Sequence, residues 1–157
     1  MVDAGVGLRS VHLREDYPAV ADYVVVSALV AAAEELGYDY HVGLTTSTDS
    51  FYAGQSREGY AGFLARDGEA KIEELRRAGV LNFEMEASAI LTIASLYGLR
   101  AGAVCSAYAN RVTGEFRTEG ESRAAETASL ATHLLAKMDA VKREAGVDRW
   151  HAGLSLE

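Results

Sequence analysis

The sequence contains few of the residues that break or cross-link a chain. Its 157 residues include one proline, Pro18, and one cysteine, Cys105. A lone cysteine forms neither an internal disulfide nor a cysteine-based metal site, so we expect a reducing, cytoplasmic location. With 49% apolar residues, the chain is long enough for one domain that buries roughly 70% of its unfolded surface.

Positive charge and long apolar runs are also scarce. The formal net charge is -8, and only three residues are lysine. This balance opposes a nucleic-acid backbone, so we expect no nucleic-acid partner. No apolar run approaches the roughly 20 residues of a membrane span, so we expect no membrane partner. The four histidines lack ligand spacing, so no metal site is predicted: His12, His41, His133 and His151.

Four segments carry apolar residues at helical spacing, at 24–36, 69–77, 86–97 and 121–145. The first three are each followed closely by glycine, which favours a left-handed helix end. The third is apolar on most faces and is predicted to be buried. The last has one apolar stripe, formed by Ala125, Ala128, Leu130, Ala131, Leu134, Leu135, Met138 and Val141.

Strand-prone segments lie between these helices, at 38–46, 80–84 and 100–109. The alternation predicts an α/β fold, in which ligands gather at the carboxyl ends of strands. We expect a single domain over 1–145 and a loose tail over 146–157. Two unusual loops follow strands in this order, and both contain chemistry-bearing residues.

The first loop combines Phe51, Tyr52, Gly54, Gln55 and Arg57. An aromatic ring can stack on a planar heterocycle, while an amide and a guanidinium can pair with its polar edge. Uracil has such an edge, with carbonyl and imide groups. In the alternative interpretation, the two rings anchor the loop, and the amide and guanidinium are merely solvated. Tyr52 is expected to pack rather than to contact a base.

The second loop contains Glu84, Met85 and Glu86, where a strand passes into a helix. In extended backbone, positions 84 and 86 point the same way, so both carboxylates could face one cleft, whereas helical geometry from Glu86 onward would separate them. A carboxylate can accept hydrogen bonds from the 2' and 3' hydroxyls of a ribose. Alternatively, the glutamates favour a helix N-terminus and Met85 fills core space.

Five collinear blocks together resemble the uridine phosphorylases of the nucleoside phosphorylase family: PAVADY, ALVAAAEELG, HVGLTTSTDSFYAGQSR, GVLNFEMEASAIL and GLRAGAVCSAYANR. Collinear blocks are far more specific than one short motif. The resemblance covers about residues 17–137. It implies part of a three-layer α/β/α fold with a mixed central sheet.

The resemblance also implies roles for single residues. Phe51 would stack on or beside the nucleoside, and Gln55 with Arg57 would bind the uracil edge. Met85 and Glu86 would hold the ribose, with Glu84 in the same motif. Arg111 matches the arginine that helps position uracil. The catalytic candidates are therefore Arg57 and Arg111.

Some positions depart from the family pattern. This chain has Ala53 where the family usually has proline, and Tyr108 and Ala109 where larger aliphatic residues are usual. Purine-directed relatives carry an aspartate at this strand end, which Ser106-Ala-Tyr-Ala109 lacks. The departures leave base selectivity open, although the missing aspartate favours a pyrimidine.

The resemblance implies no cofactor, inorganic phosphate as co-substrate, and a homo-oligomer, since the family forms hexamers of dimers. Full-length members have a preceding part with a Gly-rich phosphate loop, and we expect this chain to lack it. Gly5 and Gly7 are interpreted as merely flexible. Two functions therefore stay open: part of a uridine phosphorylase that is inactive alone, or a catalytically silent nucleoside-binding or assembly module.

Overall fold

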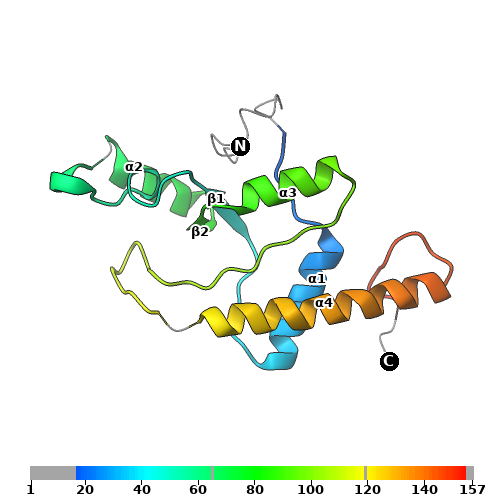
Figure 1. Ribbon diagram of the computed structural model, residues 1–157. Coiled ribbons are helices and arrows are strands. Elements are labelled where there is room, and N and C mark those ends of the chain that lie inside the picture. Colours follow the sequence, from blue (N-terminus) through cyan, green and yellow to red (C-terminus); the bar gives the residue numbers. More distant parts are fainter. Residues whose placement is uncertain (1–16, 65, 119, 155–157) are drawn as a thin grey trace. The chain divides into compact units, whose positions relative to one another are not determined.

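A computed structural model describes residues 17–64, 66–118 and 120–154 of the chain (Figure 1). It contains two compact units. The first comprises Met1–Val20, His41–Ala101 and Ala109–Glu115, as far as these residues are described. The second comprises Ala21–Tyr40, Gly102–Tyr108 and Phe116–Glu157, within the same limit. Every candidate site residue belongs to the first unit.

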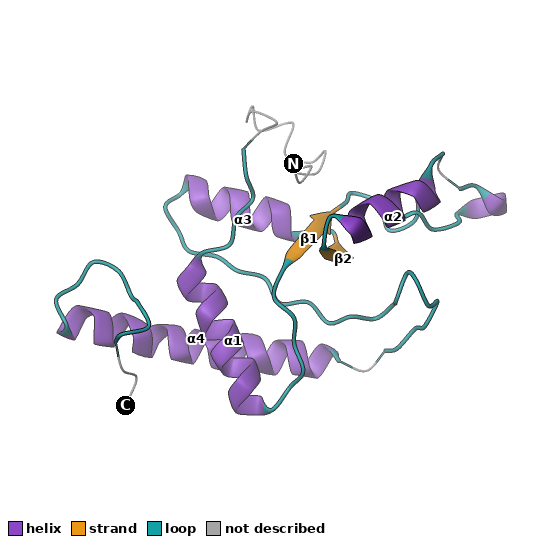
Figure 2. Ribbon diagram, turned by 180° about the vertical axis from the view of Figure 1, so that it is seen from behind, coloured by secondary structure: helices purple, strands orange, loops and turns teal. Residues whose placement is uncertain are grey.

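The second unit is built on two helices, α1 (Tyr23–Leu36) and α4 (Glu121–Glu144). Asp22 caps α1, since its carboxylate accepts hydrogen bonds from the N–H groups of Val24 and Val25 at 2.9 and 3.1 Å. Gly37 ends α1 with a left-handed φ of 67°, as its glycine predicts. Both views show α1 crossing α4 (Figures 1 and 2).

The crossing of these helices is the apolar core of the second unit. Its buried members are Val24, Ala28, Ala32, Ala131, Leu134 and Met138. The small alanines on α1 let the two helix backbones approach each other closely. The larger side chains of α4 then fill the space between the helices. The predicted stripe on α4 is partly wrong, because Ala125 and Ala128 are exposed. Trp150, in the predicted tail, packs against this core, and its carbonyl accepts a hydrogen bond from Tyr23 at 2.7 Å.

The first unit contains a parallel pair of strands, β1 (Leu44–Ser47) and β2 (Val80–Glu84). In their register, Ser47 lies opposite Glu84, so both strands end at one level. A surface helix, α2 (Gly68–Arg77), precedes β2, and α3 (Ala87–Leu96) follows it. Two short 3-10 helices, η2 (Ala53–Gln55) and η3 (Tyr60–Gly62), lie between β1 and α2.

The prediction of a buried third helix is wrong for α3. Ala87, Ser88, Leu91 and Thr92 are buried, but Ile90, Ile93, Leu96 and Tyr97 are exposed. A helix that is apolar all round needs partners on every side. In the described part of the chain, only one face of α3 is covered.

The predicted strand over 100–109 is also wrong. Residues 101–108 adopt neither helix nor strand, and Cys105 in their centre is exposed. A strand persists only where its N–H and C=O groups pair with a neighbouring strand. Within the described ranges, the sheet pairs only β1 with β2. The first strand likewise occupies 44–47 rather than 38–46.

The fold is of the α/β class, as the alternation of segments predicts. The two strands run parallel, and helices precede and follow β2 in the chain. The single domain over 1–145 stays a prediction, and Gly5 and Gly7 lie outside the described residues. No helix in the described ranges is long and apolar enough to cross a membrane.

Candidate functional site

The candidate base-binding loop begins where β1 ends. Ser47 and Thr48 are buried there, and the N–H of Thr48 donates to the carbonyl of Glu84 at 2.9 Å. This bond continues the pairing of the strands into the loop. The chain then turns through η2, where the carbonyl of Tyr52 accepts from the N–H groups of Gln55 and Arg57 at 3.2 and 2.8 Å.

Phe51 and Arg57 lie against each other. The guanidinium carbon of Arg57 is 4.2 Å from the centre of the Phe51 ring, a cation–π contact. Tyr52 meets the same ring edge-to-face, with centroids 5.3 Å apart and planes at 85°. Tyr52 is nevertheless 57% exposed, so its role as a packing residue rather than a base contact stays a prediction. Phe51 is exposed as well, so the two rings do not anchor the loop in a core.

Gln55 is the buried residue of this loop. Only 6% of its surface is exposed, whereas the alternative interpretation has it merely solvated. Placing an amide in the interior is costly unless hydrogen bonds compensate it. The interpretation of Gln55 as a solvated loop residue is therefore wrong, and a specific role for its amide is favoured.

Arg111 joins the base-binding loop from a distant part of the sequence. Its Nη2 donates to the carbonyl of Ser56 at 3.0 Å. Burial lowers the pKa of the Arg111 guanidinium, and the positive charge of Arg57 lowers it further. The structure thus brings Arg57 and Arg111 together, as the predicted base site requires. Arg111 is half-buried and not a plain surface residue.

Three donors at this place have no hydrogen-bond partner among the described residues. They are the Nε atoms of Arg57 and Arg111 and the hydroxyl of Ser56, all buried from water. Buried donors normally find an acceptor, and two nearby guanidinium groups repel each other. A ligand with a carbonyl or anionic edge would remove both costs. Ser56 was not among the residues that the sequence predicted.

The two glutamates of the second loop do different things. The carboxylate of Glu84 turns toward the N-terminus of α3 and accepts from the N–H groups of Glu86, at 2.7 Å, and Ala87. It also accepts from the hydroxyl of Ser47, which in turn accepts from the N–H of Ser88 at 2.9 Å. Glu84 thus joins β1 to α3. This structural role, rather than a shared cleft, is what the geometry gives it.

Met85 and Glu86 remain available to a ligand. Glu86 occupies the cap position of α3 with its side chain exposed, and Met85 is also exposed. Of the two geometries weighed from the sequence, the helical one applies, because β2 ends at Glu84 and Glu86 is already the cap residue of α3. In the described part of the chain, no hydrogen bond joins Gln55, Arg57 or Arg111 to Met85 or Glu86.

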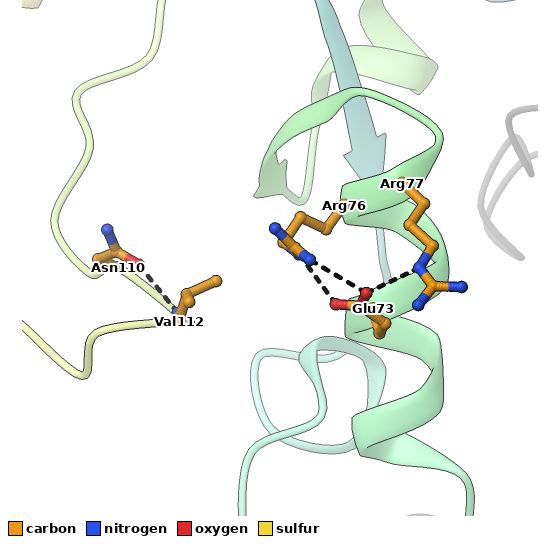
Figure 3. Close-up of polar contacts among 5 residues, drawn as sticks. All are labelled: Glu73, Arg76, Arg77, Asn110 and Val112. Atoms are coloured by element: carbon orange, nitrogen blue, oxygen red, sulfur yellow. Dashed lines mark hydrogen bonds and ion pairs between the residues drawn. The ribbon is translucent and has the colours of Figure 1, made fainter.

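A hollow of about 440 Å³ opens beside Arg111 in the same unit. It is lined by Ser56, Glu69, Ile72, Glu73, Arg76, Arg111 and Val112. On α2, Arg76 and Arg77 both reach Glu73 (Figure 3), with Nε to carboxylate distances of 2.8 Å. The hydrogen bonds to Arg76 and then Arg77 lower the pKa of Glu73.

The backbone next to Arg111 is held by a local turn. The Oδ1 of Asn110 accepts from the N–H of Val112 at 2.8 Å (Figure 3) and from the N–H of Thr113 at 3.1 Å. Asparagine often stabilises turns in this way. Arg111 therefore projects from a defined turn. No cluster of three His, Cys, Asp or Glu side chains in the described ranges could hold a metal.

Comparison with known proteins shows the family to which the chain belongs. The family model described as the phosphorylase superfamily matches residues 3–138. The chain belongs to the phosphorylase superfamily. Its match begins before the region in which the blocks resemble uridine phosphorylases and ends one residue after it. The predicted resemblance is thereby confirmed.

Three similar proteins are named for two different nucleosides, uridine and guanosine. A uridine phosphorylase of Thermococcus kodakarensis is 50% identical over 148 residues, which cover 94% of this chain and 53% of the relative. The uridine phosphorylase of Salmonella typhimurium is 44% identical over 101 residues, which cover 64% of this chain and 40% of the relative. A guanosine phosphorylase of Halorubrum lacusprofundi is 35% identical over 99 residues, which cover 63% of this chain and 36% of the relative. The chain spans about half the length of the Thermococcus relative and less of the others.

Proposed function

We propose that this chain supplies the base and ribose contacts for phosphorolysis of uridine, which yields uracil and ribose 1-phosphate. The observation that carries the proposal is the pair of half-buried arginines, Arg57 and Arg111, whose buried Nε donors lack partners among the described residues. They lie beside an exposed aromatic ring, Phe51. Relatives named uridine phosphorylase at 44–50% identity support the choice of base.

In this proposal the chemistry rests on positioning and electrostatics, without a covalent nucleophile. Ribosyl transfer passes through an oxocarbenium-like transition state, in which the departing base gains negative charge. Arg57 and Arg111 would stabilise that charge as it develops, because they are already in place and partly desolvated. Gln55 would offer both a donor and an acceptor to the uracil edge.

Glu86 and Met85 are proposed to hold the ribose. The exposed carboxylate of Glu86 can accept from two adjacent hydroxyl groups, which fixes the sugar for attack by phosphate. Glu84 supports this contact indirectly, because it orders the backbone N–H groups at the start of α3. Inorganic phosphate would be the co-substrate, with its contacts provided by a further polypeptide segment. We also propose a homo-oligomer in a reducing cytoplasm and no organic cofactor.

The second candidate function is a catalytically silent nucleoside-binding or assembly module. The exposed apolar residues of α3 favour an association role, since such surfaces commonly mark contacts with other chains. The phosphorylase proposal and the nucleoside-binding form of the module share uridine binding. They differ in whether phosphate-dependent cleavage follows when the rest of a phosphorylase fold is supplied.

The test measures uracil release from uridine with and without inorganic phosphate. The chain is assayed alone and after mixing with the N-terminal half of a superfamily relative, and uridine binding is measured by calorimetry. Phosphate-dependent release only in the mixture supports the phosphorylase proposal. Binding without release in either case supports the silent module. If uridine binds neither to the chain alone nor to the mixture, the phosphorylase proposal and the nucleoside-binding module are both wrong, and only the assembly role is left.

A further inference from the structure

Lys71 of α2 contacts the base-binding loop directly. Its Nζ donates to the carbonyl of Gly54 at 2.7 Å and lies 5.9 Å from the centre of the Phe83 ring on β2. The side chain is exposed, so a surface role is the simplest alternative. Lys71 is nevertheless the only lysine before residue 137, so no nearby lysine in the sequence duplicates it.

The carbonyl that Lys71 binds belongs to the peptide that leads into Gln55. A peptide group is planar, so fixing the Gly54 oxygen also fixes the N–H of Gln55. That N–H, which points away from the Gly54 oxygen within the same plane, donates to the carbonyl of Tyr52 at 3.2 Å. Lys71 and Tyr52 therefore hold this peptide from both ends, which sets the direction in which the Gln55 side chain leaves the backbone.

The backbone of the loop is also closely packed at Gly54 and against Gly68 of α2. A Cβ added at Gly54 would lie 3.0 Å from Cβ and Oγ1 of Thr48, closer than ordinary contact. The backbone at Gly54 thus fits tightly against the residue after β1. At the start of α2, a Cβ on Gly68 would lie 3.2 Å from Cβ of Ser56. Helix α2 therefore supports the loop at two points, on either side of Gln55.

We infer that Lys71 is a positioning residue that orients Gln55 toward the uracil edge by anchoring the Gly54–Gln55 peptide. The inference rests on the proposed binding of uridine, because Gln55 matters only if a base is bound. Lys71 itself touches no ligand in this account. Its effect on binding must therefore pass through Gln55, and a thermodynamic cycle can detect that dependence.

The experiment compares Lys71→Met, which keeps the aliphatic stem, with Lys71→Arg, which keeps a charged donor. The matched control is Lys137→Met, an exposed lysine on α4. Uridine affinity is measured in the wild-type and Gln55→Ala backgrounds. Amide hydrogen exchange at Gln55 and Arg57 is followed by NMR without ligand, and the melting curve confirms that each variant is folded.

Lys71→Met is expected to weaken uridine binding about fivefold in the wild-type background and to have little effect in the Gln55→Ala background. The amides of Gln55 and Arg57 should exchange about fivefold faster, while those of α1 do not change. Lys71→Arg should restore both properties, and Lys137→Met should alter neither.

An equal loss of affinity in both backgrounds would overturn the inference, since Lys71 would then act independently of Gln55. Unchanged exchange at Gln55 in Lys71→Met would also overturn it. If the wild-type chain does not bind uridine, the proposed function fails, and the exchange experiment still decides whether Lys71 anchors the loop. The two failures are therefore distinguishable.

Discussion

The guanidinium carbon of Arg57 lies 4.2 Å from the centre of the Phe51 ring, so one face of this ring is covered by a cation. A nucleoside that stacks on Phe51 must use the other face or displace Arg57. Displacement would free the guanidinium to pair with the polar edge of the base. Before the ligand binds, the contact between Arg57 and Phe51 would keep the loop ordered.

Removing the ring is expected to weaken nucleoside binding. Phe51→Ala should reduce uridine affinity about tenfold, because stacking on an aromatic side chain contributes roughly 1–3 kcal/mol per base. Calorimetric titration with uridine measures the change. Tyr52→Phe is the control, since it keeps the edge-to-face contact with Phe51 and should bind normally. Normal binding by Phe51→Ala would remove this ring from the base site.

The two glutamates of the second loop should respond oppositely to substitution. Glu84→Gln replaces a carboxylate that accepts from Ser47 and from two N–H groups of the α3 start. Loss of these bonds should lower the free energy of unfolding by about 1–3 kcal/mol. Glu86→Gln, at an exposed position, should leave stability unchanged and weaken uridine binding about tenfold.

Urea denaturation and uridine titration of both glutamine variants separate these effects. The assignment is contradicted if Glu86→Gln destabilises the fold more than Glu84→Gln. It is also contradicted if Glu84→Gln lowers uridine affinity with no change in stability, because Glu84 would then contact the ligand.

Arg57 and Arg111 should favour a base that accepts hydrogen bonds. Cytidine carries an amino group where uridine has a carbonyl, so it offers these cations a donor instead of an acceptor. We expect uridine to bind about tenfold more tightly than cytidine, with Arg111→Met reducing the preference. Competition binding with the two nucleosides measures it. Equal affinities in the wild-type chain would show that these arginines do not read that edge.

The titration of Glu73 should follow its contacts on α2. Hydrogen bonds from Arg76, and then from Arg77, lower the pKa of Glu73 below its ordinary value of 4.5. A lowered folded-state pKa means that this interaction stabilises the fold above pH 4.5 and is lost as the pH falls through the lowered pKa. NMR titration of the side-chain carboxyl should therefore give a midpoint below 4.5.

Replacing both arginines with glutamine supplies the control for this titration. The midpoint of Glu73 should return toward its ordinary value in Arg76→Gln/Arg77→Gln. An unchanged midpoint would mean that the arginine contacts do not persist in solution. The surface position of all three side chains makes the effect sensitive to salt.

Local patterns in the sequence predicted much of the secondary structure. The helices α1, α2 and α4 and the strand β2 lie close to their predicted ranges, because caps and apolar spacing act within a few residues. Gly37, Gly79 and Gly98 all adopt the left-handed conformation that ends or follows a helix. The segment over 100–109 could not be predicted this way, because a strand also depends on a partner that is remote in sequence.

The candidate site divides in the same manner. The sequence by itself determined which residues could recognise a base and a ribose, since ring, amide, guanidinium and carboxylate chemistry belongs to the residue types. Only the tertiary structure decided their relations: Arg111 bonded to Ser56, Glu84 turned toward Ser47 and α3, and Lys71 placed on the Gly54 carbonyl. The contacts of Lys71 with Gly54, Glu84 with Ser47 and Arg111 with Ser56 join residues 17 to 55 positions apart. Chain folding creates them through the pairing of β1 with β2 and the packing around it, which no local pattern specifies.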